Sequence, residues 1–118
     1  MLRSPRRLRR SLASIVALGS LLWSADPGAA AGRSKPTTHT VVMEATGFTP
    51  AALTIAAGDA VIWVNKDPFP HTATSKPGKF DSGSVDAGKS WKFTARTKGE
   101  FDYLCTFHPT MKGTLRVK

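Results

Sequence analysis

The sequence predicts an all-β fold, a sandwich or barrel of seven or eight short strands. Short runs rich in Val, Thr and aromatic residues suit strands, and turns recur every 8–12 residues or so, the spacing typical of such folds. The 118 residues include 10 Gly and 8 Pro, and the part of the chain after the N-terminal segment has no useful stretch of helical period. Hydrophobic residues make up 41% of the chain, which excludes a disordered protein.

The N-terminal segment, residues 1–31, predicts a cleaved secretory signal. Five arginines precede an apolar run over residues 12–23, and a small-residue tract follows, which is the order of a signal peptide. The apolar run is shorter than the roughly 20 residues that cross a bilayer. The alternatives are a basic amphipathic or membrane-surface helix and an uncleaved anchor. The paired arginines leave the twin-arginine export route open beside the general one. We therefore expect a periplasmic or otherwise exported protein without a stable membrane anchor, with a flexible leader over 32–38 and one domain over 39–118.

The predicted strands follow one another from residue 40 onward. The first is β-branched, the third is a nearly continuous apolar run typical of a buried strand, and later ones alternate apolar and polar residues, so that Phe101, Tyr103 and Cys105 share a face. Residues 47–50 interrupt the pattern, and residues 71–75 resume extended structure. The predicted strands are 40–44, 53–55, 60–64, 90–95, 101–105 and 114–118. The predicted core aromatics are Phe48, Trp63, Trp91, Phe93 and Phe101, joined by Leu53.

The net charge and the cysteine content indicate the kind of partner and the source of stability to expect. The chain carries a formal charge of +9, and residues 32–118 keep 12 basic and 7 acidic residues, a net +5. This balance favours a partner with an acidic docking surface, and no nucleic-acid-binding motif accompanies it. The single cysteine, Cys105, excludes an internal disulfide. A domain this small usually adds a disulfide or a metal, so a bound metal is the expected source of extra stability.

Four side chains suit a copper ion. Cys105, His108 and Met111 stand three residues apart, and His71 follows a Pro-rich loop far upstream. Thiolate and thioether favour copper, and two imidazoles with a thiolate and a weak axial Met define the blue-copper electron-transfer site. Zinc also binds Cys and His, but Met is a poor zinc ligand. The pattern therefore predicts one copper per chain, held by these four residues.

Two stretches of the chain resemble the cupredoxins, and most of all their amicyanin branch and the plastocyanins. They are residues 101–113 and Trp63–Asn65, the latter followed by Pro70 and His71. The resemblance covers residues 40–118. It implies a Greek-key β-sandwich, a hydrogen bond from Asn65 near the Cys105 sulfur, and a role for Thr106 in holding Asn65, contacts that orient ligands and tune the metal.

Phe69, Pro70, Phe107 and Pro109 flank the two histidines in loops, and Phe107 replaces the Pro that is frequent in the family. We expect them to form an apolar docking rim, with the electron leaving through His108. The predicted protein is a monomeric one-electron carrier and not an enzyme, and its resemblance to amicyanin suggests a dehydrogenase as donor and a c-type cytochrome as acceptor. A copper-delivery protein of the same fold and, less favoured, a small copper enzyme are the alternatives. An enzyme would need an open metal position and further ligands, yet His39 is the only other histidine.

Overall fold

The computed structural model describes residues 34–118, so the predicted signal peptide lies outside the described residues. This part of the chain contains eight strands and no helix, which confirms the all-β prediction. The strands are β1 (Thr38–Glu44), β2 (Gly47–Thr49), β3 (Ala52–Ile55), β4 (Ala60–Asn65), β5 (Thr74–Ser75), β6 (Ser90–Thr94), β7 (Gly99–Leu104) and β8 (Lys112–Val117). Accordingly, no helix within residues 34–118 has the length and apolar character needed to cross a membrane.

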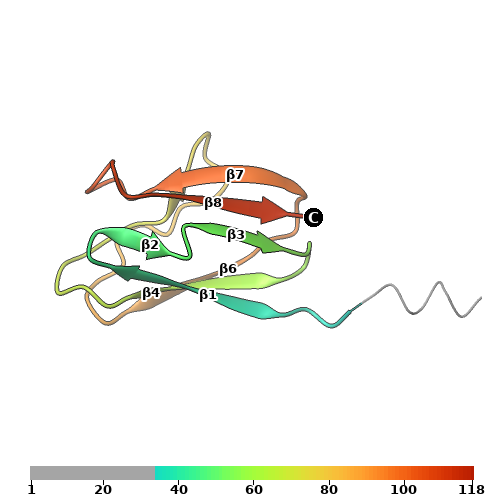
Figure 1. Cartoon of the computed structure of the whole chain (residues 1–118), viewed down its shortest axis with the longest axis horizontal. Coiled ribbons are helices and arrows are strands. Elements are labelled where there is room, and N and C mark those ends of the chain that lie inside the picture. Colours follow the sequence, from blue (N-terminus) through green and yellow to red (C-terminus); the bar gives the residue numbers. More distant parts are fainter. Residues whose placement is uncertain (1–33) are drawn as a thin grey trace, which may run out of the picture. The chain divides into compact units, whose positions relative to one another are not determined.

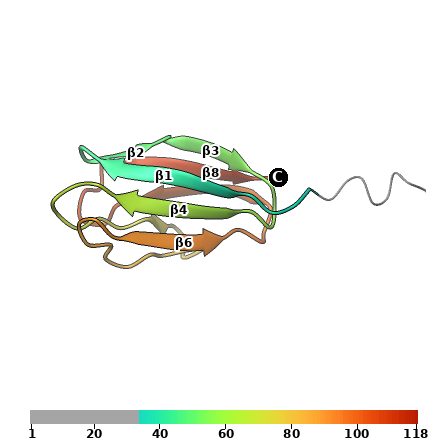
Figure 2. The same ribbon diagram turned by 90° about the horizontal axis from the view of Figure 1, so that it is seen from below.

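The strands form two four-stranded sheets packed face to face (Figure 1). One sheet has the order β2-β1-β4-β6 and the other the order β3-β8-β7-β5. Each sheet is mixed: β1 runs parallel to β4 and β3 parallel to β8, whereas the remaining pairs are antiparallel. Between β2 and β7 every connection passes from one sheet to the other. The sheet ends therefore gather loops that lie far apart in the sequence (Figure 2).

Two elements differ from the sequence prediction. Residues 47–49, predicted only as an interruption, form β2, because the chain reverses over two residues and pairs Glu44 with Gly47. The predicted extended stretch 71–75 shortens to β5, although His71 still pairs with Val85 in an isolated bridge.

The core lies between the sheets and centres on Trp63, which is fully buried. Its ring packs against Trp91, Phe80 and Tyr103 with ring centroids 5.5–5.6 Å apart. Alternation along β4 directs Val61, Trp63 and Asn65 inward, since side chains on a strand point to opposite faces with period two.

The other predicted core aromatics divide into two groups. Phe48 is buried, whereas Trp91, Phe93, Phe101 and Leu53 are partly buried and pack against the core. Trp91 and Phe93 lie on β6, an edge strand. Phe101 lies on a stretch of β7 that the short β5 does not reach, since β5 pairs only with Tyr103 and Leu104.

A buried carboxylate holds the start of β1. Asp59 is 8% exposed, and its carboxylate accepts hydrogen bonds from the amides of Thr37 (2.9 Å) and Ala56 (3.1 Å). The His39 Nε2 atom lies 3.0 Å from the same carboxylate. The bond from Thr37, followed by that from His39, lowers the Asp59 pKa below its ordinary value of 3.8. This end of the sandwich is thereby tied to the turn before β4.

We expect Asp59→Asn to destabilise the domain in a pH-dependent way. The pKa of Asp59 is lower in the folded chain than in the unfolded chain, so its stabilising contribution is fully present above pH 3.8 and is lost as the pH falls through the folded-state pKa. Urea denaturation should therefore show a gap between wild type and variant that is constant near neutral pH and closes in strong acid. A gap of the same size at all pH values would contradict this role of the carboxylate.

Gly113 is the position in β8 that tolerates no side chain. It lies opposite Tyr103 in the sheet, and a Cβ atom there would lie 2.5 Å from the Tyr103 hydroxyl oxygen. The Tyr103 ring is buried, its pKa is raised to about 12 by that burial, and it packs edge-on against Phe48 at 4.7 Å. Displacing the ring would therefore disturb its packing against Phe48.

Gly113→Ala should lower the free energy of unfolding by about 1–3 kcal/mol, the usual cost of overpacking a core. The matched control is Gly47→Ala, because a Cβ at residue 47 meets only the Glu44 carbonyl oxygen at an ordinary 3.6 Å. Thermal or urea denaturation of both variants measures the difference. Equal stability of the two variants would show that the Tyr103 ring adjusts at little cost.

Candidate metal centre

The loop between β7 and β8 brings three of the predicted ligands to one end of the sandwich. Cys105 follows β7 directly, and alternation along that strand turns its side chain inward, where it is fully buried. The Cys105 amide donates to the Met111 carbonyl (3.0 Å), the His108 amide to the Cys105 carbonyl (3.2 Å) and the Met111 amide to the His108 carbonyl (2.8 Å). These bonds close the loop in two three-residue steps. Both ends of the loop are buried, since Met111 is only 1% exposed.

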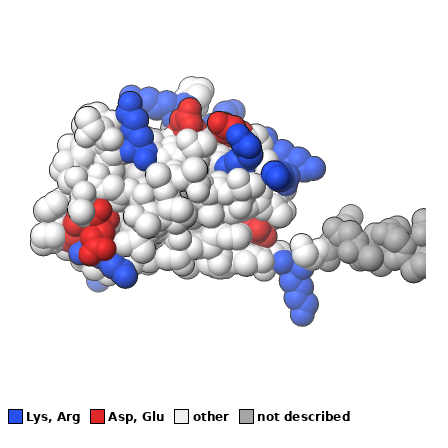
Figure 3. Space-filling model, viewed as in Figure 1, with Lys and Arg blue, Asp and Glu red and all other residues white. Residues whose placement is uncertain are grey.

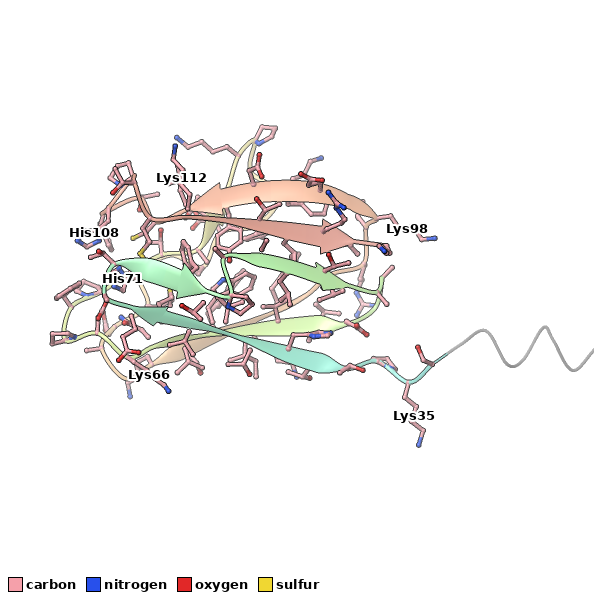
Figure 4. The ribbon with its side chains drawn as sticks, viewed as in Figure 1. Lys35, Lys66, His71, Lys98, His108 and Lys112 are labelled. Carbon is pink, nitrogen blue, oxygen red and sulfur yellow. The ribbon has the colours of Figure 1, made fainter. Side chains whose placement is uncertain are left out.

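His71 reaches the same end from the connection between β4 and β5. It is fully buried, and its backbone exchanges two hydrogen bonds with Val85, at 3.1 and 2.7 Å. This backbone pairing fixes the residue independently of its side chain. Figure 4 shows His71 and His108 together at the end opposite Lys35 and Lys98.

Three donor atoms converge at this end. The Cys105 Sγ atom lies 3.6 Å from His71 Nδ1 and 3.8 Å from His108 Nδ1, and all three donor atoms lie within 4.8 Å of one another. Ligands at about 2.0–2.3 Å from an ion in a trigonal arrangement are separated by roughly 3.5–4 Å. The donor set therefore has both the chemistry and the spacing to hold a single ion, with Met111 at the end of the loop as the predicted fourth ligand.

Thr72 connects the two ligand-bearing loops. Its amide donates to the Cys105 sulfur at 3.3 Å, and its hydroxyl oxygen accepts from the Thr106 amide at 2.9 Å. Thr72 thus makes the sulfur contact that the family resemblance assigned to Asn65, and Thr106 bonds to Thr72 instead of Asn65.

Asn65 holds the upstream loop instead. Its side-chain amide donates to the carbonyls of Phe69 (2.8 Å) and Val85 (2.9 Å), and its carbonyl oxygen accepts from the Asp67 amide (2.9 Å). Asn65 is the last residue of β4 and is fully buried. The hydrogen bonds of its side chain go to the backbone of the loops beside it and not to the sulfur. Asn65 and Thr106 both lie near the ligands, but they do not contact each other through any hydrogen bond found in residues 34–118.

The sequence analysis missed Asp67, which lies next to the buried ligand. The His71 Nε2 atom lies 2.5 Å from the Asp67 carboxylate, and this hydrogen bond is the main cause that holds the pKa of Asp67 below its usual range. Because a carboxylate accepts hydrogen bonds, we assign a proton to Nε2 in this contact, and Nδ1 faces the sulfur. Carboxylates commonly orient metal-binding imidazoles in this way. An acidic residue four positions before the histidine was the available signal.

An apolar rim surrounds the half-buried His108. Phe69 and Phe107 are the exposed large hydrophobic side chains of the described chain, at 39% and 52%. The Phe69 ring lies 5.2 Å from the His71 ring and 5.6 Å from the His108 ring, between centroids. Pro70 and Pro109 are also exposed. The four residues predicted to form the rim are therefore all accessible from solvent.

Charged side chains lie near the end of the sandwich that carries the two histidines, outside the apolar rim. Figure 4 places Lys66 and Lys112 on either side of the two histidines. Figure 3 shows a mostly uncharged surface across the middle of the viewed face, with basic and some acidic side chains along its upper edge and both kinds of charge at the lower left.

Comparisons with known proteins agree with the fold. A model of the Cupredoxin-like domain family matches residues 14–117. Amicyanin from Paracoccus versutus is 34% identical over 71 residues, which are 56% of this chain and 54% of that protein. Plastocyanin from Scenedesmus fuscus is 33% identical over 84 residues, 60% of this chain and 86% of that protein.

A copper-containing nitrite reductase from Thermus scotoductus has a similar structure, with a TM-score of 0.66 and 30% identity over 80% of this chain but only 27% of the enzyme. The chain likewise spans about half the length of the amicyanins that it matches. The family match over residues 14–117 and the plastocyanin match over most of that protein nevertheless establish the family: the chain belongs to the cupredoxin-like domain family.

Proposed function

We propose that this protein is a type 1 blue copper protein that carries one electron at a time between redox partners. The observation that carries the proposal is the convergence of one buried sulfur and two imidazole nitrogens within 4.8 Å. His71, Cys105, His108 and Met111 would hold one copper. When bound, copper supplies a centre that alternates between Cu(II) and Cu(I).

The surroundings of the ligands favour electron transfer over metal release or catalysis. Cys105 and His71 are fully buried, and each is held by contacts independent of a metal, through Thr72, Asp67 and Val85. A fixed donor set changes little between oxidation states, which keeps electron transfer fast. A delivery protein would instead need ligands that let the metal go.

The similarity to nitrite reductase covers 27% of that enzyme and does not by itself suggest catalysis. Metal catalysis needs an open coordination position. His39, the only other histidine of the chain, lies within hydrogen-bond distance of Asp59 near the start of β1. Figure 4 shows His71 and His108 at the opposite end of the sandwich from Lys35, which precedes β1. His39 is therefore not placed to add a ligand at the metal centre. We therefore propose an electron carrier that is not an enzyme.

The apolar rim would be the docking surface. Phe69 and Phe107 are exposed beside His108, whose accessible edge offers the shortest path from the ion to a partner. With a net charge of +5 on residues 32–118, the partner would carry an acidic surface. A dehydrogenase as donor and a c-type cytochrome as acceptor fit this scheme. The protein would act as an exported, periplasmic monomer, with residues 1–31 removed as a signal and 39–118 as its domain.

The copper(II) form should be intensely coloured, with one copper per chain, because the thiolate transfers charge to the metal. Cys105→Ser should abolish the visible band, whereas Met111→Leu should keep the band and shift the reduction potential. Visible spectroscopy, copper analysis and voltammetry of the three proteins provide the test. A colourless Cu(II) complex of the wild type would refute the proposed function.

Docking through the rim predicts a specific loss of transfer rate. Phe107→Ala should slow the second-order electron transfer to an acidic c-type cytochrome at least about fivefold, which corresponds to about 1 kcal/mol of lost binding free energy, without changing the visible spectrum. The wild-type rate should also fall as ionic strength rises past about 0.1 M, where the Debye length is about 10 Å.

Lys98→Ala is the matched control, because Lys98 lies at the opposite end of the molecule (Figure 4). Stopped-flow kinetics of the variants measure the effect. Equal rates for Phe107→Ala and Lys98→Ala would place the docking surface elsewhere.

A further inference from the structure

The turn between β1 and β2 has a backbone that its own residues do not favour. Ala45 and Thr46 connect Glu44 with its partner Gly47, and both have positive φ, at 52° and 54°. Two-residue hairpin turns with positive φ at both positions strongly prefer Asn-Gly or Gly-Gly. A β-branched threonine is an outlier in this region of backbone space. Within the turn, the Thr46 hydroxyl donates to the Ala45 carbonyl at 2.7 Å, but this bond leaves both backbone amides to be paired from elsewhere in the chain.

The Asp67 carboxylate supplies that pairing. Its Oδ1 atom accepts from the Ala45 amide at 2.9 Å, and its Oδ2 atom accepts from the Thr46 amide at 3.3 Å. Asp67 is 8% exposed, so water competes little for these bonds. The neighbouring Lys66 amide donates to the Met43 carbonyl at 2.9 Å. The loop after β4 is thus joined to the end of β1 through both its backbone and its carboxylate.

The same Oδ2 atom lies 2.5 Å from His71 Nε2. One carboxylate therefore contacts two groups that are 25 positions apart in the sequence, the strained turn and the buried imidazole. Moving the turn would move or rotate the carboxylate, and rotating the carboxylate would change the bond that fixes the imidazole. Because such coupling is reciprocal, fixing the imidazole on a metal should also tighten the turn.

We propose that Asp67 is a positioning residue that couples the Ala45–Thr46 turn to His71, which makes this turn part of the structure that holds the metal. This inference rests on the proposed metal site. The turn is not adjacent in sequence to any ligand and contributes no ligand atom. The turn holds the Asp67 carboxylate in place through two amides. The carboxylate in turn orients the His71 ring and accepts a hydrogen bond from the proton on Nε2.

Asp59 provides a matched control within the same chain. Like Asp67, it is 8% exposed, accepts two backbone amides and lies within hydrogen-bond distance of a histidine Nε2. Its histidine, His39, is not one of the proposed ligands. Asp59→Asn therefore removes a carboxylate of the same kind without touching the metal centre, and it separates a local effect from general destabilisation.

The first measurement uses the metal-free protein, so its result does not depend on copper. Nitrogen-15 NMR of the histidine rings should show His71 as a single tautomer with the proton on Nε2 in the wild type and in Asp59→Asn. In Asp67→Asn, we expect a mixture of tautomers. An unchanged single tautomer in Asp67→Asn would overturn the positioning role.

The second measurement uses the Cu(I)-loaded protein. In wild type and Asp59→Asn, copper should slow hydrogen exchange of the Ala45 and Thr46 amides. In Asp67→Asn this response should disappear, and the copper dissociation rate should rise about 10–100-fold, the range typical for removing a group that supports a ligand. An equal rise in Asp59→Asn, or no rise in Asp67→Asn, would overturn the proposal.

A variant with a self-sufficient turn keeps the test valid if Asp67→Asn does not fold. The double substitution Ala45→Asn with Thr46→Gly installs the preferred residues of this turn type. In that background, Asp67→Asn should fold and still lose copper faster, and normal copper retention would overturn the proposal. If the wild type binds no copper, the proposed function fails, whereas the NMR measurement still decides whether Asp67 positions His71.

Discussion

The hydrogen bond from the Thr72 amide to the Cys105 sulfur joins the two loops that carry all the predicted ligands. One loop leaves β4 in the first sheet, and the other leaves β7 in the second sheet. Both loops reach the same end because the chain alternates between the sheets. The 3.3 Å contact and the Thr72–Thr106 contact beside it hold the two loops together at the end where the donor atoms converge.

Buried carboxylates stabilise both ends of this small sandwich. Asp59 holds the start of β1 against the turn before β4, and Asp67 holds the end of β1 against the loop after β4. Each lies beside a histidine, but only His71 belongs to the metal centre. Similar local chemistry therefore serves fold stability at one end and, in our proposal, function at the other.

The sequence predicted the parts of the site that side-chain identity marks. The spacing of Cys105, His108 and Met111 predicted a short metal-binding loop, and aromatic residues beside histidines predicted an exposed rim. The role of Thr72 was not predictable, because its bond to sulfur comes from a backbone amide that any residue except proline has. The role of Asp67 was missed because its partners come from a turn that lacks glycine and so gave no turn signal.

X-ray absorption at the copper edge of the loaded protein tests the central claim most directly. The claim is that one sulfur and two imidazole nitrogens form the nearest shell around the metal. The account predicts one short copper–sulfur bond and two copper–nitrogen bonds in the wild type, with the sulfur contribution lost in Cys105→Ser. A nearest shell made only of nitrogen and oxygen atoms in the wild type would contradict it.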